Sequence, residues 1–176
     1  MWRVSLAVFL ATSTWFSGTA AGLPLAEAWS LSPAQGAWLT ISVQLGFISG
    51  TFLYALFNLA DVFNARGVFL ASAVLGALSN AAFGLLSVGL SEALVYRFLT
   101  GLTLAGVYPV GMKIVASWFQ TGLGWRLGVM VGALTLGTAS PFLVQHLGAA
   151  FPWRAPVLLA SLAAAGGGAL MWWGVR

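Results

Sequence analysis

The sequence has no cysteine and few charged residues. Seven basic and three acidic side chains make up 6% of its 176 residues, whereas 60% of the residues are hydrophobic. A water-soluble domain of this size needs a polar coat that so few charges do not supply. The absence of cysteine excludes disulfides and thiol chemistry. The composition therefore argues strongly against a soluble fold.

Carboxylates are also missing from the long apolar runs of the chain. Asp61 lies at the edge of one run, and Glu27 and Glu92 lie in connections between runs. The sequence shows no nucleophile–base pair, no metal-ligand cluster and no phosphate-binding glycine loop. Its basic residues are spread along the chain rather than gathered into a patch. We therefore expect no enzyme activity, no cofactor, no bound metal and no nucleic-acid partner.

Apolar residues are abundant and form six runs. These cover about 3–22, 35–57, 67–88, 93–116, 127–148 and 155–175. Each has about the 20 residues that a helix needs to cross the hydrocarbon layer of a membrane. The runs are long and do not alternate with period two, which favours helices over the strands of a membrane barrel. The sequence predicts an all-α membrane protein, with six transmembrane helices in a single domain over residues 1–176.

Basic residues predict the orientation of these helices, because they resist transfer across the membrane. Five of the seven belong to one set of helix ends: Arg3, Arg66, Lys113, Arg126 and Arg176. The opposite set has Arg97 and Arg154. We expect both termini to be cytoplasmic and the protein to be integral to a bacterial inner membrane, with the lipid bilayer as its surroundings.

Polar residues inside the runs are candidates for a functional cavity, because an ionisable group at the membrane centre costs about 2.5–3.5 kcal/mol. Arg97 lies more than one turn inside the fourth run, and on an ideal helix it shares a face with Tyr108. Lys113 faces elsewhere unless the helix bends near Pro109. The alternatives are snorkelling of the basic groups and local hydrogen bonding of the hydroxyls. The full set of cavity candidates is Arg97, Tyr108, Thr12, Trp15, Thr19, Gln44 and Lys113.

Glycines recur at four-residue spacing in several runs. Examples are Gly46 with Gly50, and the series Gly124, Gly128 and Gly132. Small residues at this spacing allow helix backbones to approach closely in lipid. We interpret them mainly as helix-packing positions.

Two segments resemble signatures of the major facilitator superfamily. The loop Phe57-Asn-Leu-Ala-Asp-Val-Phe-Asn-Ala-Arg66 is similar to the G-x-L-A-D-R-x-G-R-K motif between the second and third spans of that family. Four positions match: Leu59, Ala60, Asp61 and Arg66. Four depart from the motif: Phe57, Val62, Asn64 and Ala65. The segment Arg97-Phe-Leu-Thr-Gly101 resembles the family's R-x-x-x-G element in the fourth span.

The resemblance implies a fold and a function. The chain resembles an N-terminal six-helix half of a twelve-span transporter, built as two inverted three-helix repeats. Family members move solutes by alternating access, with substrate bound between two halves, so one half offers one wall of a cavity. We expect secondary transport by a parallel homodimer of such half-transporters. One alternative is a half or fragment that needs a different six-helix chain, and another is a non-transporting membrane scaffold.

The resemblance also implies roles for charged residues. In the family the loop acid faces the start of a helix in the other half, where the helix dipole favours negative charge. We therefore expect Asp61, with Arg66, to approach the start of the partner's fifth span near Arg126 and to help close the inner gate. Two copies of Arg97 around one cavity would favour a small polar or anionic solute.

Overall fold

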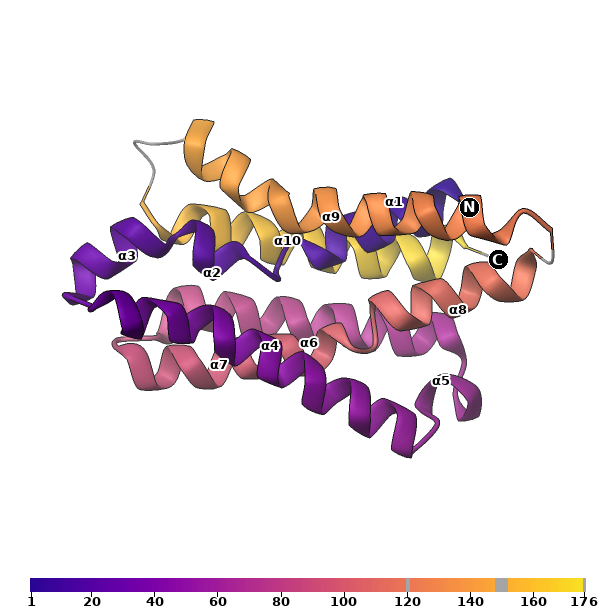
Figure 1. Ribbon diagram of the computed structural model, residues 1–176, viewed down its shortest axis with the longest axis horizontal. Coiled ribbons are helices and arrows are strands. Elements are labelled where there is room, and N and C mark those ends of the chain that lie inside the picture. The colour runs from indigo at the N-terminus through magenta and orange to yellow at the C-terminus, as the bar shows by residue number, and fades with distance from the viewer. Residues whose placement is uncertain (120, 148–151, 176) are drawn as a thin grey trace.

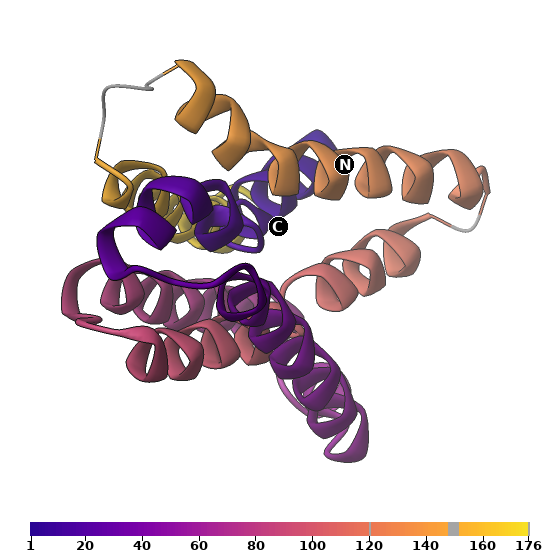
Figure 2. The same ribbon diagram turned by 60° about the vertical axis from the view of Figure 1, so that its left-hand side comes forward.

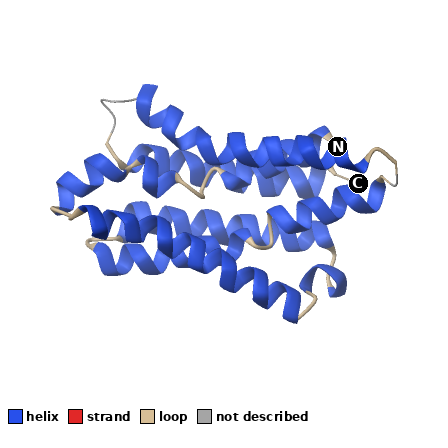
Figure 3. Ribbon diagram, in the orientation of Figure 1, coloured by secondary structure: helices blue, strands red, loops and turns tan. Residues whose placement is uncertain are grey.

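The computed structural model describes residues 1–119, 121–147 and 152–175, and it places helices in all six predicted runs. Within these ranges there is no strand (Figure 3). In the described residues five helical segments are long and apolar enough to span a membrane, one of which, Leu90–Trp118, comprises α7 and α8; the shorter apolar helix Trp2–Thr12 belongs to the first run. The helices are α1 (Trp2–Thr12), α2 (Ser17–Ala20), α3 (Gly22–Trp29), α4 (Pro33–Leu56), α5 (Leu59–Val62), α6 (Ala65–Leu86), α7 (Leu90–Leu104), α8 (Tyr108–Trp118), α9 (Leu123–Leu147) and α10 (Arg154–Gly174). The all-helical prediction is confirmed.

The helices form two groups that pack against each other. α1 packs between α9 and α10, and α7 packs between α4 and α6, while α6 and α10 join the groups. In Figure 1 the first group lies above the second, and both chain termini lie at the same end of the bundle. We call this end the terminal end. The contacts in the two groups are equivalent. The first span contacts the fifth and sixth, and the fourth span contacts the second and third. This pattern is that of two inverted three-helix repeats.

Local capping signals explain where the spans begin. Ser32 forms a capping box with Gln35 at the start of α4, directly before Pro33 at the first helical position. Asn64 accepts hydrogen bonds from the backbone N–H groups of Arg66 and Gly67 at the start of α6. α4, α6, α9 and α10 begin and end within about four residues of the predicted runs, although residue 148 lies outside the described residues.

The first span differs from the continuous helix predicted over 3–22. α1 ends at Thr12, and the chain then passes through residues 13–16 before α2 begins. The hydroxyl groups here bond to carbonyls one turn back: Thr12 to Val8 at 2.8 Å, and Ser13 to Leu10 at 2.7 Å. Such bonds compete with continuation of the helix, and they give the hydroxyls acceptors at membrane depth.

The fourth span is also broken, between Leu104 and Tyr108. Pro109 has no backbone N–H, so it cannot complete the helical hydrogen bond to Ala105. The predicted shared face of Arg97 and Tyr108 assumed one ideal helix, which the chain does not form between these residues. Gly106 lies in the break, and a Cβ there would collide with Ser72 Oγ and the ring of Tyr54.

Close helix packing is confirmed for some of the predicted glycines. A Cβ on Gly46 would collide with the carbonyl of Phe98, and a Cβ on Gly101 would collide with the carbonyl of Val43. These glycines let α4 and α7 touch backbone to backbone. In contrast, a Cβ added to any member of the α9 series would meet nothing within 4 Å: Gly124, Gly128 and Gly132.

Candidate functional site

Arg97 is fully buried and binds the broken part of the first span. Its Nη1 donates to the carbonyl of Thr14 at 2.9 Å, and its Nη2 donates to the carbonyl of Trp15. The guanidinium also lies 5.7 Å from the centre of the Phe83 ring. Two carbonyls left without helical partners are thus satisfied by one planar group, which arginine can do because its donors are spread over a fork.

Asn80 of α6 connects Arg97 to two further helices, and the sequence reasoning missed it. Its Oδ1 accepts from Arg97 Nη1 at 3.0 Å and from Ser17 Oγ at 2.8 Å. Its Nδ2 donates to the carbonyl of Val157 at 2.9 Å and to Ser161 Oγ at 3.0 Å. This fully buried amide therefore joins the first, third, fourth and sixth spans.

The geometry assigns Arg97 to the interior of the bundle. Its side chain has no solvent exposure, and its Nη1 and Nη2 donate to protein carbonyls and to Asn80, whereas its Nε has no hydrogen-bond partner. Thr12 is likewise buried and bonded to its own helix. A solute could not reach either group in this arrangement without displacing protein contacts. Arg97 instead binds the carbonyls of the break at residues 13–16, and Thr12 bonds within α1.

The other candidates from the first two spans lie nearer the surface. Trp15 is half-buried and contacts Phe47 of α4, with ring centroids 4.6 Å apart. Thr19 shares a hydrogen bond of 2.6 Å with Thr40 of α4. Gln44, one turn after Thr40, is exposed. These side chains belong to one face of the bundle, where the first span meets α4.

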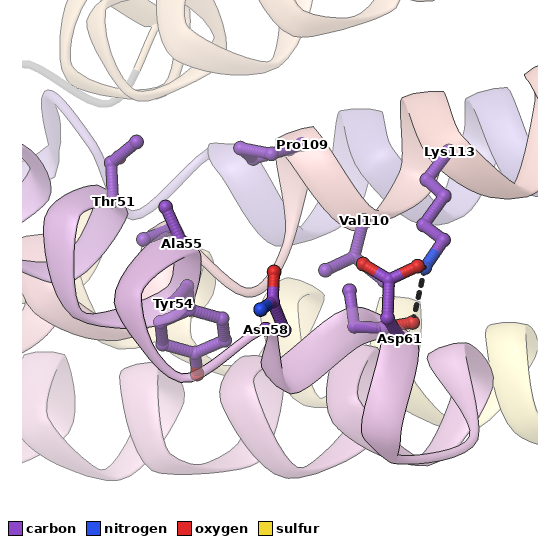
Figure 4. Close-up of a pocket in the computed structure, with 10 residues that line it drawn as sticks. Thr51, Tyr54, Ala55, Asn58, Asp61, Pro109, Val110 and Lys113 are labelled. Atoms are coloured by element: carbon purple, nitrogen blue, oxygen red, sulfur yellow. Dashed lines mark hydrogen bonds and ion pairs between the residues drawn. The ribbon is translucent and has the colours of Figure 1, made fainter.

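A pocket of about 250 Å³ opens at the terminal end between α4, α5 and α8. Figure 4 shows Lys113 reaching from α8 to Asp61 of α5 across one side of this pocket. The Lys113 Nζ and Asp61 Oδ1 atoms are 2.5 Å apart, and Nζ also donates to the carbonyl of Ala60. The polar residues Thr51, Tyr54 and Asn58 complete the lining.

Lys113, which follows the break in the fourth span, therefore lies at the pocket, whereas Arg97, which precedes the break, is buried in the bundle. The Lys113 side chain is 39% exposed, and that of Asp61 is 70% exposed. An ion pair this open to solvent contributes little stability, about 0–1 kcal/mol, and exchanges partners readily. Tyr108, by contrast, packs half-buried against the apolar core at the start of α8.

The three predicted gating residues do not meet within one chain. Asp61 binds Lys113, as described, whereas Arg66 donates to the carbonyl of Val175 at 2.6 Å and lies over the Trp172 ring. Arg126 donates to the carbonyl of Thr121, and its guanidinium carbon is 4.0 Å from the centre of the Phe119 ring. All of them lie toward the terminal end of the bundle.

Comparison with known proteins gives consistent results along the chain. The family model described as the Major Facilitator Superfamily matches residues 4–176. The niacin transporter NiaP of Acinetobacter baylyi is 32% identical over 152 residues, which cover 80% of this chain and 32% of that protein. A Bacillus subtilis protein, whose name proposes it as a niacin/nicotinamide transporter, is 28% identical over 77% of this chain and 34% of its own length.

A third relative, from Haemophilus influenzae, has a name that proposes it as a metabolite transport protein. It is 29% identical over 142 residues, which cover 74% of this chain and 32% of that protein. The chain thus spans about a third of the length of the curated relatives it matches. The family match over residues 4–176 covers every helix described above except the first two residues of α1.

Proposed function

The chain belongs to the major facilitator superfamily, and from this membership we propose that it forms one wall of a secondary carrier for a small polar or anionic solute. The observation that carries the proposal is the exposure of α4 and α9, which the first span connects through contacts of Trp15 and Phe16; we call the exposed surface from α4 across residues 13–16 to α9 the open face. The most apolar stretches of these spans are only 28% and 17% buried, less than in the other three long spans. In Figure 2 the two spans flank α8, with α9 in orange, α8 in salmon and α4 in purple.

A second wall must cover this face, because apolar spans alone do not enclose a polar solute. The glycine series of α9 supports this step, since its open surface can accept a close helix backbone. We propose that the second wall is a parallel second copy of this chain, related by a two-fold axis along the membrane normal. Alternating access then follows from rocking of one copy against the other.

A different six-helix chain is the second candidate for the opposite wall. It is favoured by the relatives, each of which has about two thirds of its length outside the matched part. The first candidate predicts a carrier of two identical chains, and the second predicts a carrier of two different chains. Both assign the same open face to the same solute path.

We further propose that Asp61 takes part in closing the gate at the terminal end, which we place in the cytoplasm. In this chain Asp61 is bound to Lys113, and its carboxylate is mostly exposed. It can therefore leave Lys113 for the positive end of a partner helix at little cost. Arg126, near the start of α9, marks the corresponding position on a second copy.

Solute flux into liposomes tests the proposal. Niacin is a suitable probe because its carboxylate is anionic at neutral pH and because a relative's name includes it. We expect purified chain to take up labelled niacin in a saturable manner, with Asp61→Asn reducing the rate and Glu92→Gln, an exposed acid outside the pocket, leaving it unchanged. Absence of flux at every protein density would favour a different partner chain or a scaffold role. Equal rates for Asp61→Asn and the wild type would remove the gating role.

A further inference from the structure

Four aromatic side chains form a row across the open face. The centroid of the Trp15 ring is 4.6 Å from that of the Phe47 ring on α4 and 6.4 Å from that of the Phe16 ring. Phe16 is in turn 6.2 Å from Phe142 of α9. The row therefore runs from α4 to α9 through the broken part of the first span. We call Trp15, Phe16, Phe47 and Phe142 the aromatic row.

The aromatic row is accessible rather than sealed in the core. Trp15, Phe16 and Phe47 are half-buried, and Phe142 is 45% exposed. The row also joins the two least buried long spans of the chain. Rings that only fill a core would be enclosed on all sides, as Phe69 and Phe83 are at 0% exposure. The aromatic row instead offers free ring surface.

Arg97 and Asn80 fix the position of the row from behind. Arg97 donates to the carbonyls of Thr14 and Trp15, and Ser17 on the next turn donates to Asn80. The non-helical segment that carries Trp15 and Phe16 is thus held on its inner side by buried hydrogen bonds. A preorganised surface loses less conformational freedom when a ligand binds.

A polar group lies next to the row. Gln44 precedes Phe47 by three residues on α4, so their side chains lie on the same face of that helix. Gln44 is exposed, and its amide can both donate and accept hydrogen bonds. Ligand sites in proteins combine apolar and aromatic walls with a few polar groups that set orientation. Free aromatic surface beside an amide fits a flat ring that carries a polar substituent.

We propose that the aromatic row is the binding surface for a planar aromatic solute, whose ring packs on Trp15 and Phe47 while Gln44 bonds its polar substituent. This inference rests on the proposed transport function and narrows its solute class. It also changes the role of Arg97, which becomes a positioning residue behind Trp15 rather than a contact to the solute. The niacin named for one relative is a ring of this kind, a pyridine with a carboxylate.

Equilibrium binding to the chain in lipid nanodiscs tests the inference without requiring flux. The probe is labelled niacin, with benzoate as a ring-containing competitor and hexanoate as an aliphatic one. We expect Trp15→Leu and Phe47→Leu each to weaken niacin binding about tenfold, which corresponds to about 1.4 kcal/mol. Trp15→Phe keeps a ring and should stay within about threefold of the wild type. Phe57→Leu, at a 60% exposed ring at the end of the same helix, is the matched control and should have no effect.

The outcomes separate this inference from the proposed function. Loss of binding in the two leucine variants, retention in Trp15→Phe and competition by benzoate but not hexanoate would support the aromatic row. The same pattern without flux would contradict transport by this chain and still support the binding surface. Niacin flux with unchanged affinity in both leucine variants would overturn the binding surface and leave transport supported. Equal competition by hexanoate, or no saturable binding of niacin or benzoate by the wild type, would also overturn it.

Discussion

Replacing Asn80 with leucine should destabilise the bundle through its effect on Arg97. The substitution removes four hydrogen bonds, two accepted and two donated by the Asn80 amide. The three neutral partners have other bonds: the Ser17 hydroxyl can donate to the carbonyl of Thr14 at 3.0 Å instead, and Ser161 still donates to the carbonyl of Val157 at 2.9 Å. The main loss is therefore the bond from the buried Arg97 cation.

The size of the loss follows from these contacts. Hydrogen bonds between membrane helices contribute about 0.6 kcal/mol on average and up to about 1.7 kcal/mol. A bond to a charged group contributes more, about 1.5–3 kcal/mol. Since most neutral partners of Asn80 remain satisfied, we expect Asn80→Leu to lower the free energy of unfolding by about 2 kcal/mol.

A double-mutant cycle measures the part of this loss that comes from Arg97. Arg97→Met removes the charge while keeping a long apolar side chain, and in that background Asn80→Leu should cost about 1 kcal/mol or less. Unfolding in lipid bicelles, followed for the four proteins of the cycle, gives the coupling energy. Gln44→Leu is the matched control, an exposed amide whose loss should change stability by less than about 0.5 kcal/mol. An equal cost of Asn80→Leu in both backgrounds would refute the assigned link.

Three further predictions concern other contacts. Lys113→Gln should change the free energy of unfolding by less than about 1 kcal/mol, because its ion pair with Asp61 is exposed. The same variant should alter niacin flux. A large loss of stability would instead show that the ion pair is structural. Gly101→Val should lower stability by about 2 kcal/mol or more, because the added side chain forces α4 away from α7. Gly166→Ala, with open space around it, should not lower stability. Equal effects of the two variants in thermal unfolding would contradict the close packing of α4 on α7. Gly128→Leu should leave the unfolding of the single chain unchanged but reduce chain association, measured by energy transfer between labelled copies; unchanged association would remove α9 from the interface.

The bounds of α4, α6, α9 and α10 lie close to the predicted runs because apolar length and capping residues are local properties. The capping box from Ser32 to Gln35 and the cap at Asn64 lie where the apolar runs begin. The sequence predicts that hydroxyls around Trp15 line a cavity. That this segment interrupts the helix depends on Arg97, which lies 82 positions away from Trp15 and supplies the missing donors.

The buried network was missed for a definable reason. Asn80 is a neutral amide in an otherwise apolar run, as Gln44 is, and nothing local in the sequence shows that it meets Arg97 and Ser17. The same rule that singled out Arg97 applies to any strong polar group at membrane depth, so Asn80 carried a usable signal. The aromatic row carried none, because Phe47 and Phe142 look like ordinary core residues until the break at residues 13–16 and the packing of three spans bring them together.

The dependence of niacin uptake on protein density in liposomes tests the central claim, that this chain is one wall that needs a second. If two copies form the carrier, the initial rate per chain should rise with the protein-to-lipid ratio at low density and level off once most chains are paired. A saturable rate per chain that stays constant down to an average of less than one chain per liposome would show that one copy transports alone, and it would contradict the account.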